Sequence, residues 1–187
     1  MLIALNYVGN RQLTEFVTAC TQAHTLLQSP DFITLIEGKQ THFDDAVPVD
    51  LAATQVAGYF RDETFTLSVD DYEDEDGRTT VGGRFVTSSP TTIWLNRLAM
   101  PRREACEFAS VLIHESVHAM SRRISRRTNG QVSFTHIPAN RRTGNLLTAP
   151  YWIQEEAEVG LCGQRLAEEE RLTIETVDDE PRQAEKG

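Results

Sequence analysis

The longest helical pattern in the chain, from about residue 102 to residue 126, is the feature that most constrains its fold. Its apolar side chains recur at steps of three and four residues, with one single step, as on the buried face of a helix. These side chains are Cys106, Ala109, Leu112, Ile113, Val117, Met120 and Ile124. The same stretch contains the pentapeptide HESVH, residues 114–118. Polar groups that are buried without partners are costly, so this pentapeptide needs partners.

The spacing of the two histidines in this pentapeptide suits a metal ion. Residues four apart on a helix differ by about 40° around its axis and by roughly 6 Å along it. His114 and His118 can therefore bind one ion, while Glu115 lies beside them and can hold a water bound to that ion. Zinc lowers the pKa of such a water toward about 7, and a carboxylate can accept its proton. We therefore predict a zinc site in which His114 and His118 are ligands and Glu115 is the general base.

A catalytic zinc also needs a third protein ligand and an open position for water. The pattern in which a glycine and a third histidine follow the pentapeptide is absent, because Ser121 and Ile124 occupy those positions. The remaining candidates lie in a long loop, residues 128–150, and in a helix expected over residues 151–170. They are His136, Glu155, Glu156 and Glu158.

This order of elements resembles the zincin metallopeptidases: a strand, a long helix with His-Glu-x-x-His, and a second helix with a glutamate. It is similar in particular to the gluzincins, whose third ligand is a glutamate on the downstream helix. The run from Trp152 to Glu155 resembles the Trp-Leu-x-Glu run that opens this helix in many gluzincins. Glu155-x-x-x-Val159-Gly160 resembles the corresponding helix of the clostridial-neurotoxin and type III effector zinc proteases. The resemblance covers roughly residues 91–165.

The resemblance implies a fold and assigns roles to residues. It implies an α+β domain of zincin type, with a small twisted mixed sheet, an active-site helix and a downstream ligand helix. It makes Glu155 the third zinc ligand, with Glu156 as runner-up and Glu158 as a possible partner of a ligand. In zincins, the edge strand before the active-site helix pairs with the substrate backbone, which would be the role of residues 91–95.

The alternation and composition of the remaining segments predict the other elements. Residues 64–69 alternate with period two, as a half-buried strand does. The acidic run 70–76 is interpreted as a solvated hairpin loop, and residues 79–86 as the returning strand, bulged or bent at Gly82-Gly83. Further helices are expected over residues 11–28, 30–37 and 50–59.

Two side chains near the predicted site have open roles. His136 is a third zinc ligand, a donor that stabilises the oxyanion at the scissile carbonyl, or a loop histidine without a role. Tyr151 is either a donor of the same kind or a structural residue at the start of the last helix. Both are therefore candidate catalytic residues beside Glu115.

A group of arginines surrounds the same loop: Arg122, Arg123, Arg126, Arg127, Arg141 and Arg142. Cations are favourable at the C-terminus of any helix, so some of these arginines need no function. Alternatively, they attract an acidic substrate or partner.

The length and charge of the chain bound its organisation and its partners. The 187 residues fit one domain, expected over residues 1–174, and the polar residues 175–187 are expected to form a disordered acidic tail. A formal net charge of -10 argues against nucleic-acid binding, which requires Lys and Arg to neutralise phosphates. No stretch of about 18 apolar residues exists, so no membrane span is expected.

Cysteine usage and the N-terminal residues bear on localisation. The cysteines, Cys20, Cys106 and Cys162, are an odd number and widely spread, so we interpret them as reduced thiols. The first residues lack the basic leader and cleavage site of an ordinary signal peptide. We therefore expect a cytoplasmic protein, or one exported without a classical signal peptide.

These observations together predict a zinc-dependent metallopeptidase. Its cofactor would be Zn²⁺, and its substrate a peptide or protein cut by a water that zinc and Glu115 activate. One alternative is a zinc-binding interaction or regulatory protein that keeps the ligands without turnover. Another is an effector or toxin whose narrow specificity leaves general substrates uncut.

Overall fold

The computed structural model describes residues 2–9, 13–86, 91–135, 148–166 and 173–177. Its elements follow in the order β1 (Leu2–Tyr7), α1 (Thr14–Leu27), α2 (Pro30–Glu37), α3 (Ala53–Asp62), β2 (Thr64–Tyr72), β3 (Val81–Val86), β4 (Thr92–Asn96), the 3₁₀ turn η1 (Met100–Arg102), α4 (Ala105–Arg127), α5 (Ala149–Cys162) and β5 (Thr173–Val177). The fold is α+β, as the sequence predicted.

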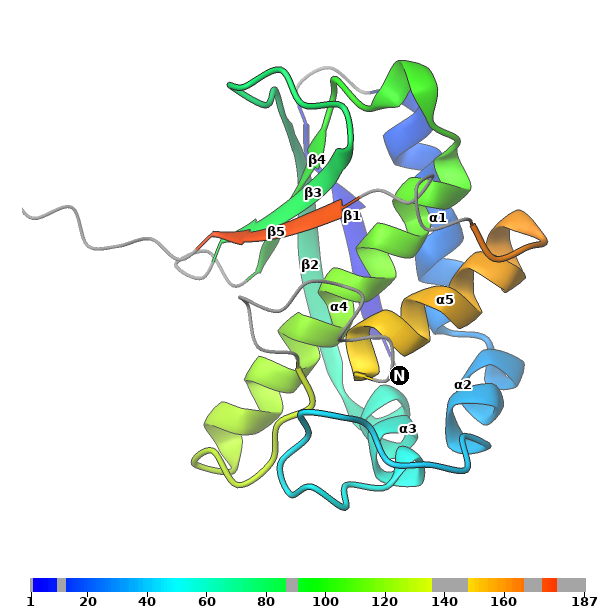
Figure 1. Cartoon of the computed structure of the whole chain (residues 1–187), viewed down its shortest axis with the longest axis vertical. Coiled ribbons are helices and arrows are strands. Elements are labelled where there is room, and N and C mark those ends of the chain that lie inside the picture. Colours follow the sequence, from blue (N-terminus) through cyan, green and yellow to red (C-terminus); the bar gives the residue numbers. More distant parts are fainter. Residues whose placement is uncertain (1, 10–12, 87–90, 136–147, 167–172, 178–187) are drawn as a thin grey trace, which may run out of the picture.

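The strands form one mixed sheet in the order β1-β2-β4-β3-β5. The neighbours β1, β2 and β4 are parallel, β3 runs antiparallel to β4, and β5 is parallel to β3. The helices lie on one side of this sheet, where α1 packs against β1 and α4, and α4 also packs against α5 (Figure 1). None of the helices in the described ranges is long and apolar enough to cross a membrane.

Burial along the central strands explains the alternation in the sequence. Leu67 and Val69 of β2, with Ile93 and Leu95 of β4, are buried in the core together with residues of α4. The side chains between them are more exposed, because successive residues of a strand face opposite sides of the sheet. The helix-covered side of the sheet therefore forms the main core.

The helix α4 approaches the sheet closely at a glycine of β3. A Cβ added at Gly83 would come within 3.0 Å of Val111 Cγ1 on α4. The pairing of β3 with β5 also shifts register between Val81 and Gly83, which confirms the irregularity expected at Gly82-Gly83. Because Gly83 has no side chain, α4 can lie close against the sheet at Val111, one helical turn before Glu115.

Two predictions about the sheet are wrong. Residues 64–72 and 81–86 do not form a hairpin, because β4 lies between β2 and β3. For the same reason β4 is not an edge strand and cannot pair with a substrate backbone: both of its sides already bond to neighbours.

The acidic run is a solvated loop only in part: residues 70–72 belong to β2, whereas residues 73–76 follow the strand and are exposed apart from Asp74. Tyr7 donates a hydrogen bond to Asp71 at 2.7 Å, and Arg97 forms an ion pair with the same carboxylate at 2.5 Å. Asp74 accepts hydrogen bonds from two backbone N–H groups and from the side chain of Arg78. These partners hold the run against the sheet, which extends β2 to Tyr72.

The boundaries of the later elements differ from expectation at two places. The helix α5 ends at Cys162, well before residue 170, because Gly163 adopts a left-handed conformation with φ 75° that caps the helix. The strand β5 runs to Val177, so residues 175–177 of the expected tail belong to the sheet. The rest of that tail lies outside the described residues.

The prediction that all the cysteines are reduced thiols is also wrong. Cys106 and Cys162 form a disulfide with their Cα atoms 5.6 Å apart, and Cys20 is free and buried. The bond joins the first turn of α4 to the last residue of α5. Residues 56 apart in sequence meet because the two helices run antiparallel, which the cysteine spacing alone does not reveal.

We predict that loss of this disulfide strongly destabilises the protein. A crosslink over a loop of this length restricts the unfolded chain by roughly 4 kcal/mol, so the Cys106→Ser/Cys162→Ser variant should lose about that free energy of unfolding. Urea denaturation measures the loss, and reductant should then have no further effect on the double variant. Titration of the unfolded, unreduced wild type should find one reactive thiol; three would contradict the disulfide.

Candidate metal centre

The HESVH pentapeptide lies in the most deeply buried part of α4. Every residue from Cys106 to Val117 is buried, and His114 and Glu115 have no exposed surface. The ring of His118 is partly exposed. The sheet, α1 and α5 surround this part of α4, so its polar side chains depend on neighbouring elements for partners.

Each histidine is held through its Nδ1 atom by an oxygen from another segment. His114 Nδ1 lies 3.0 Å from the amide oxygen of Gln154 on α5. His118 Nδ1 lies 2.5 Å from the hydroxyl of Thr135. Because an amide oxygen can only accept, the proton of a neutral His114 is on Nδ1 and its Nε2 carries a lone pair.

The Nε2 atoms of the two histidines face each other at 3.1 Å. A lone pair on His114 Nε2 needs a positive partner there, either a proton on His118 or a cation shared by both rings. Two nitrogens bound about 2.0–2.1 Å from one tetrahedral zinc lie about 3.3 Å apart. Histidines that bind metal usually donate their other N–H to an oxygen, as His114 does to Gln154. The pair thus fits a shared zinc ion.

The carboxylate of Glu115 is fully buried and lacks a hydrogen-bond partner within the described residues. Burial raises the pKa of Glu115 to about 8, and the nearby guanidinium of Arg122 acts in the opposite direction. An ionised carboxylate in such a place is costly unless a cation, water or ligand contacts it. Its two oxygens are therefore suited to hold a water or a proton in transit.

The segment that supplies Thr135 is fixed to α4 and to the loop before α3. Ser121 of α4 accepts a hydrogen bond from the backbone N–H of Phe134 at 2.8 Å. Ser133 and Val47 exchange backbone hydrogen bonds of 2.9 and 2.7 Å. The ring of Phe134 is fully buried and stacks on Tyr59. These contacts place Thr135 next to His118.

The helix α5 turns a partly polar face toward α4. Its buried side includes Tyr151, Gln154 and Glu158, which recur at helical spacing. The Tyr151 ring lies edge-on to that of His114, with 4.6 Å between the ring centroids. Glu158 is fully buried, and one of its oxygens accepts a hydrogen bond from the backbone of Leu166 at 3.4 Å.

The structure brings together part of the predicted site. His114 contacts His118 and Tyr151, and Glu115 follows His114 on α4. Glu155 and Glu156 lie half-buried on α5. Glu156 forms an ion pair with Arg165 at 2.5 Å. Within the described ranges, no three His, Cys, Asp or Glu side chains form a group that could hold a metal ion. His136, Arg141 and Arg142 lie outside these ranges.

Sequence reasoning missed Gln154 and Thr135 as partners of the histidines. Gln154 carried a usable signal, because it is a polar residue three positions after Tyr151 and four before Glu158, on the face that α5 buries. No sequence signal identified Thr135, because its position depends on contacts between segments that are distant in sequence.

Comparisons of the chain with protein-family models, with curated proteins and with solved structures gave no match. Function is therefore inferred from the geometry of α4, α5 and the segment at Thr135.

We predict that the metal-free protein binds one zinc ion per chain through His114 and His118. The two facing Nε2 atoms should lose this affinity when either histidine is changed to alanine, and competition with a zinc-chelating dye measures the loss. The matched control is His42→Ala, because His42 is exposed and distant in sequence from α4. Unchanged zinc binding by His118→Ala would disprove the proposed pair.

Proposed function

We propose that this protein is a zinc-dependent peptidase of zincin type. One observation carries the proposal: the Nε2 atoms of His114 and His118 lie 3.1 Å apart, and the same helix buries the carboxylate of Glu115 without a hydrogen-bond partner in the described residues. A helix that buries such a group needs a compensating ligand. A mixed sheet, a long helix with the pentapeptide and a second helix packed on it are compatible with the zincin-like fold that the sequence suggested.

The chemistry would be hydrolysis of a peptide bond. Zinc, when bound, would act as a Lewis acid that polarises a carbonyl and lowers the pKa of a coordinated water. Glu115 accepts a proton from the attacking water while the oxygen of that water bonds to the carbonyl carbon. Glu115 then gives that proton to the leaving nitrogen as the carbon–nitrogen bond breaks. Because the carboxylate has no competing hydrogen bonds within the described residues, it is available for both transfers.

The neighbouring side chains orient and assist this pair. Gln154 and Thr135 hold the two imidazoles through Nδ1, which leaves each Nε2 directed toward the other. Tyr151 lies against His114 and is our candidate donor to the oxyanion of the scissile carbonyl. His136 remains a second candidate for that role.

Glu155 remains our proposed third ligand. It directly follows Gln154, the residue of α5 that contacts His114. Glu155 is half-buried, and a rotation of its side chain toward α4 would be needed to reach the ion. Glu158 is the alternative carboxylate, because it lies on the buried face of α5, one turn after Gln154.

We predict that Glu115→Gln keeps zinc but loses activity. Glutamine has nearly the same shape as glutamate but cannot accept the proton, so the rate of peptide hydrolysis should fall by about 100- to 10,000-fold. Hydrolysis of a peptide library followed by mass spectrometry measures the rate, and metal analysis confirms the bound zinc.

The control for this experiment is Glu107→Gln, which changes a glutamate in the first turn of the same helix. Normal hydrolysis by Glu115→Gln would refute the mechanism. If the wild type retains zinc but cleaves no member of the library, the zinc-binding interaction protein becomes the better explanation.

We further predict that Glu155→Gln weakens zinc binding by more than about 100-fold, the upper end of what loss of an outer-shell partner costs. Glu156→Gln should leave the affinity within about twofold, since Glu156 pairs with Arg165. The dye competition used for the histidine variants measures both. A large loss in Glu158→Gln, with none in Glu155→Gln, would transfer the ligand role to Glu158.

A further inference from the structure

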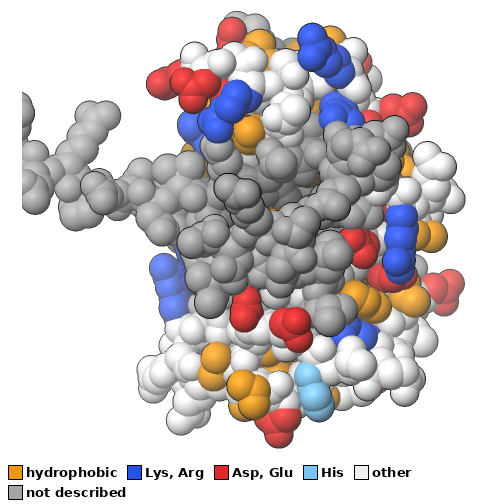
Figure 2. All heavy atoms as spheres, viewed as in Figure 1, with side chains coloured by type: hydrophobic (Ala, Val, Ile, Leu, Met, Phe, Trp, Pro, Cys, Tyr) orange, Lys and Arg blue, Asp and Glu red, His pale blue; other side chains and the backbone are white. Residues whose placement is uncertain are grey.

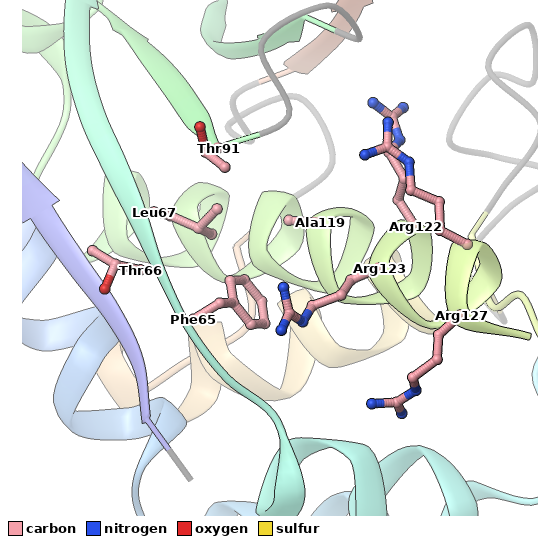
Figure 3. A pocket seen from close by; sticks show the side chains of 9 residues that line it. Phe65, Thr66, Leu67, Thr91, Ala119, Arg122, Arg123 and Arg127 are labelled. Atoms are coloured by element: carbon pink, nitrogen blue, oxygen red, sulfur yellow. The ribbon is translucent and has the colours of Figure 1, made fainter.

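A groove with arginines on one side lies between the start of β2 and the C-terminal half of α4 (Figure 3). Its volume is about 460 Å³, enough for several side chains of a bound peptide. Phe65, Leu67 and Ala119 form its apolar floor. The lining is completed by Thr66, Thr91, Arg122, Arg123, Arg126 and Arg127.

The groove continues the face of α4 that carries Glu115. At 100° per residue, Glu115, Ala119, Arg122 and Arg126 fall within about 60° of one another around the helix axis. With a rise of about 1.5 Å per residue, Arg122 and Arg126 lie about 10 and 16 Å beyond Glu115 along that axis. Ala119 lies in the floor of the groove, so the groove begins about one helical turn beyond Glu115.

The charges of the groove are only partly neutralised by the protein. Arg123 and Arg127 both form ion pairs with the buried Glu63. Arg126 makes no ion pair within the described residues, and two of the four arginines that line the groove share this one glutamate. Elsewhere, on the described part of the face in Figure 2, acidic and basic side chains are interspersed. The groove is therefore a concentrated positive site on a chain of net charge -10.

We propose that this groove binds an acidic segment of the peptide substrate. An extended peptide advances about 3.3 Å per residue, so Arg122 and Arg126 would meet side chains about three to five residues from the scissile bond. An aspartate or glutamate there pairs with a guanidinium, and an apolar neighbour rests on Phe65 and Leu67. The placement relative to the scissile bond rests on the proposed function, whereas the binding of acidic segments does not.

An acidic peptide fits better than a nucleic acid. A nucleic acid carries a charge at every nucleotide, so its backbone would be repelled by the acidic protein on leaving the groove. A peptide can place its acidic residues beside the arginines and present neutral residues elsewhere. The apolar floor also favours a chain in which charged and apolar side chains alternate.

The first experiment measures binding without turnover. The Glu115→Gln variant is mixed with each of three labelled probes, and binding is followed by fluorescence anisotropy. The probes are a peptide with three glutamates, the same peptide with glutamines in their place, and a short single-stranded DNA. The glutamate peptide should bind most tightly, and less tightly at high salt because salt screens the charges. Introducing Arg122→Glu and Arg126→Glu into this variant should weaken its binding of the glutamate peptide about tenfold or more. The control is Arg102→Glu, which changes an exposed arginine before α4 and should alter the affinity for the glutamate peptide less than about twofold.

Several results would overturn the binding claim: equal affinity for the glutamate and glutamine peptides, no effect of the groove variants, or tighter binding of DNA through the same arginines. Because Arg126 has no ion pair among the described residues, Arg126→Glu alone tests the groove even if the double variant unfolds.

The second experiment tests the placement with the active wild-type chain and a peptide library. Cleaved peptides should be enriched in Asp or Glu three to five residues to one side of the cut bond, and Arg126→Glu should remove the enrichment. Cleavage without this preference would overturn the placement alone. Absence of any cleavage would refute the proposed function and the placement with it, while the anisotropy still decides whether the groove takes acidic segments.

Discussion

Burial of the polar groups of α4 is the constraint on which the site depends. His114 and Glu115 have no surface exposed to bulk solvent, so their polar atoms depend on partners inside the protein. His114 finds its partner on α5, and His118 finds one in the segment after α4. Glu115 has no such partner within the described residues. The two histidines thus connect α4 to the surrounding elements, and Glu115 is the group to which we assign the proton transfers in our proposal.

The antiparallel pair of α4 and α5 turns this requirement into a rigid arrangement. The disulfide between Cys106 and Cys162 joins one end of the pair, and the contact between Gln154 and His114 lies near its middle. Gly163 ends α5 directly after the disulfide, so the helix has the length that these contacts need. Loss of the disulfide would therefore act on the position of Gln154 as well as on global stability.

Local patterns predicted the helices well, apart from the end of α5, and predicted the contacts between distant segments poorly. The periodicity of α4 gave its bounds to within three residues and identified the histidine pair, because residues four apart share a face in any helix. The strands β1 and β5 were missed, since short terminal runs carry little periodic signal. The order β2-β4-β3, the disulfide and the role of Thr135 depend on which distant segments meet. The spacing of residues within one segment does not predict which distant segments come into contact.

The same helix also ties chemistry to recognition. Loops often set the distance between a reacting group and the residues that select a substrate, and loops change conformation easily. Here Glu115, Arg122 and Arg126 belong to one continuous helix, whose rise per residue fixes their separation. Ion pairs of Arg123 and Arg127 with Glu63 anchor the end of α4 next to α3. In our proposal, a substrate bound at the arginines would therefore lie at a set distance from Glu115 along α4.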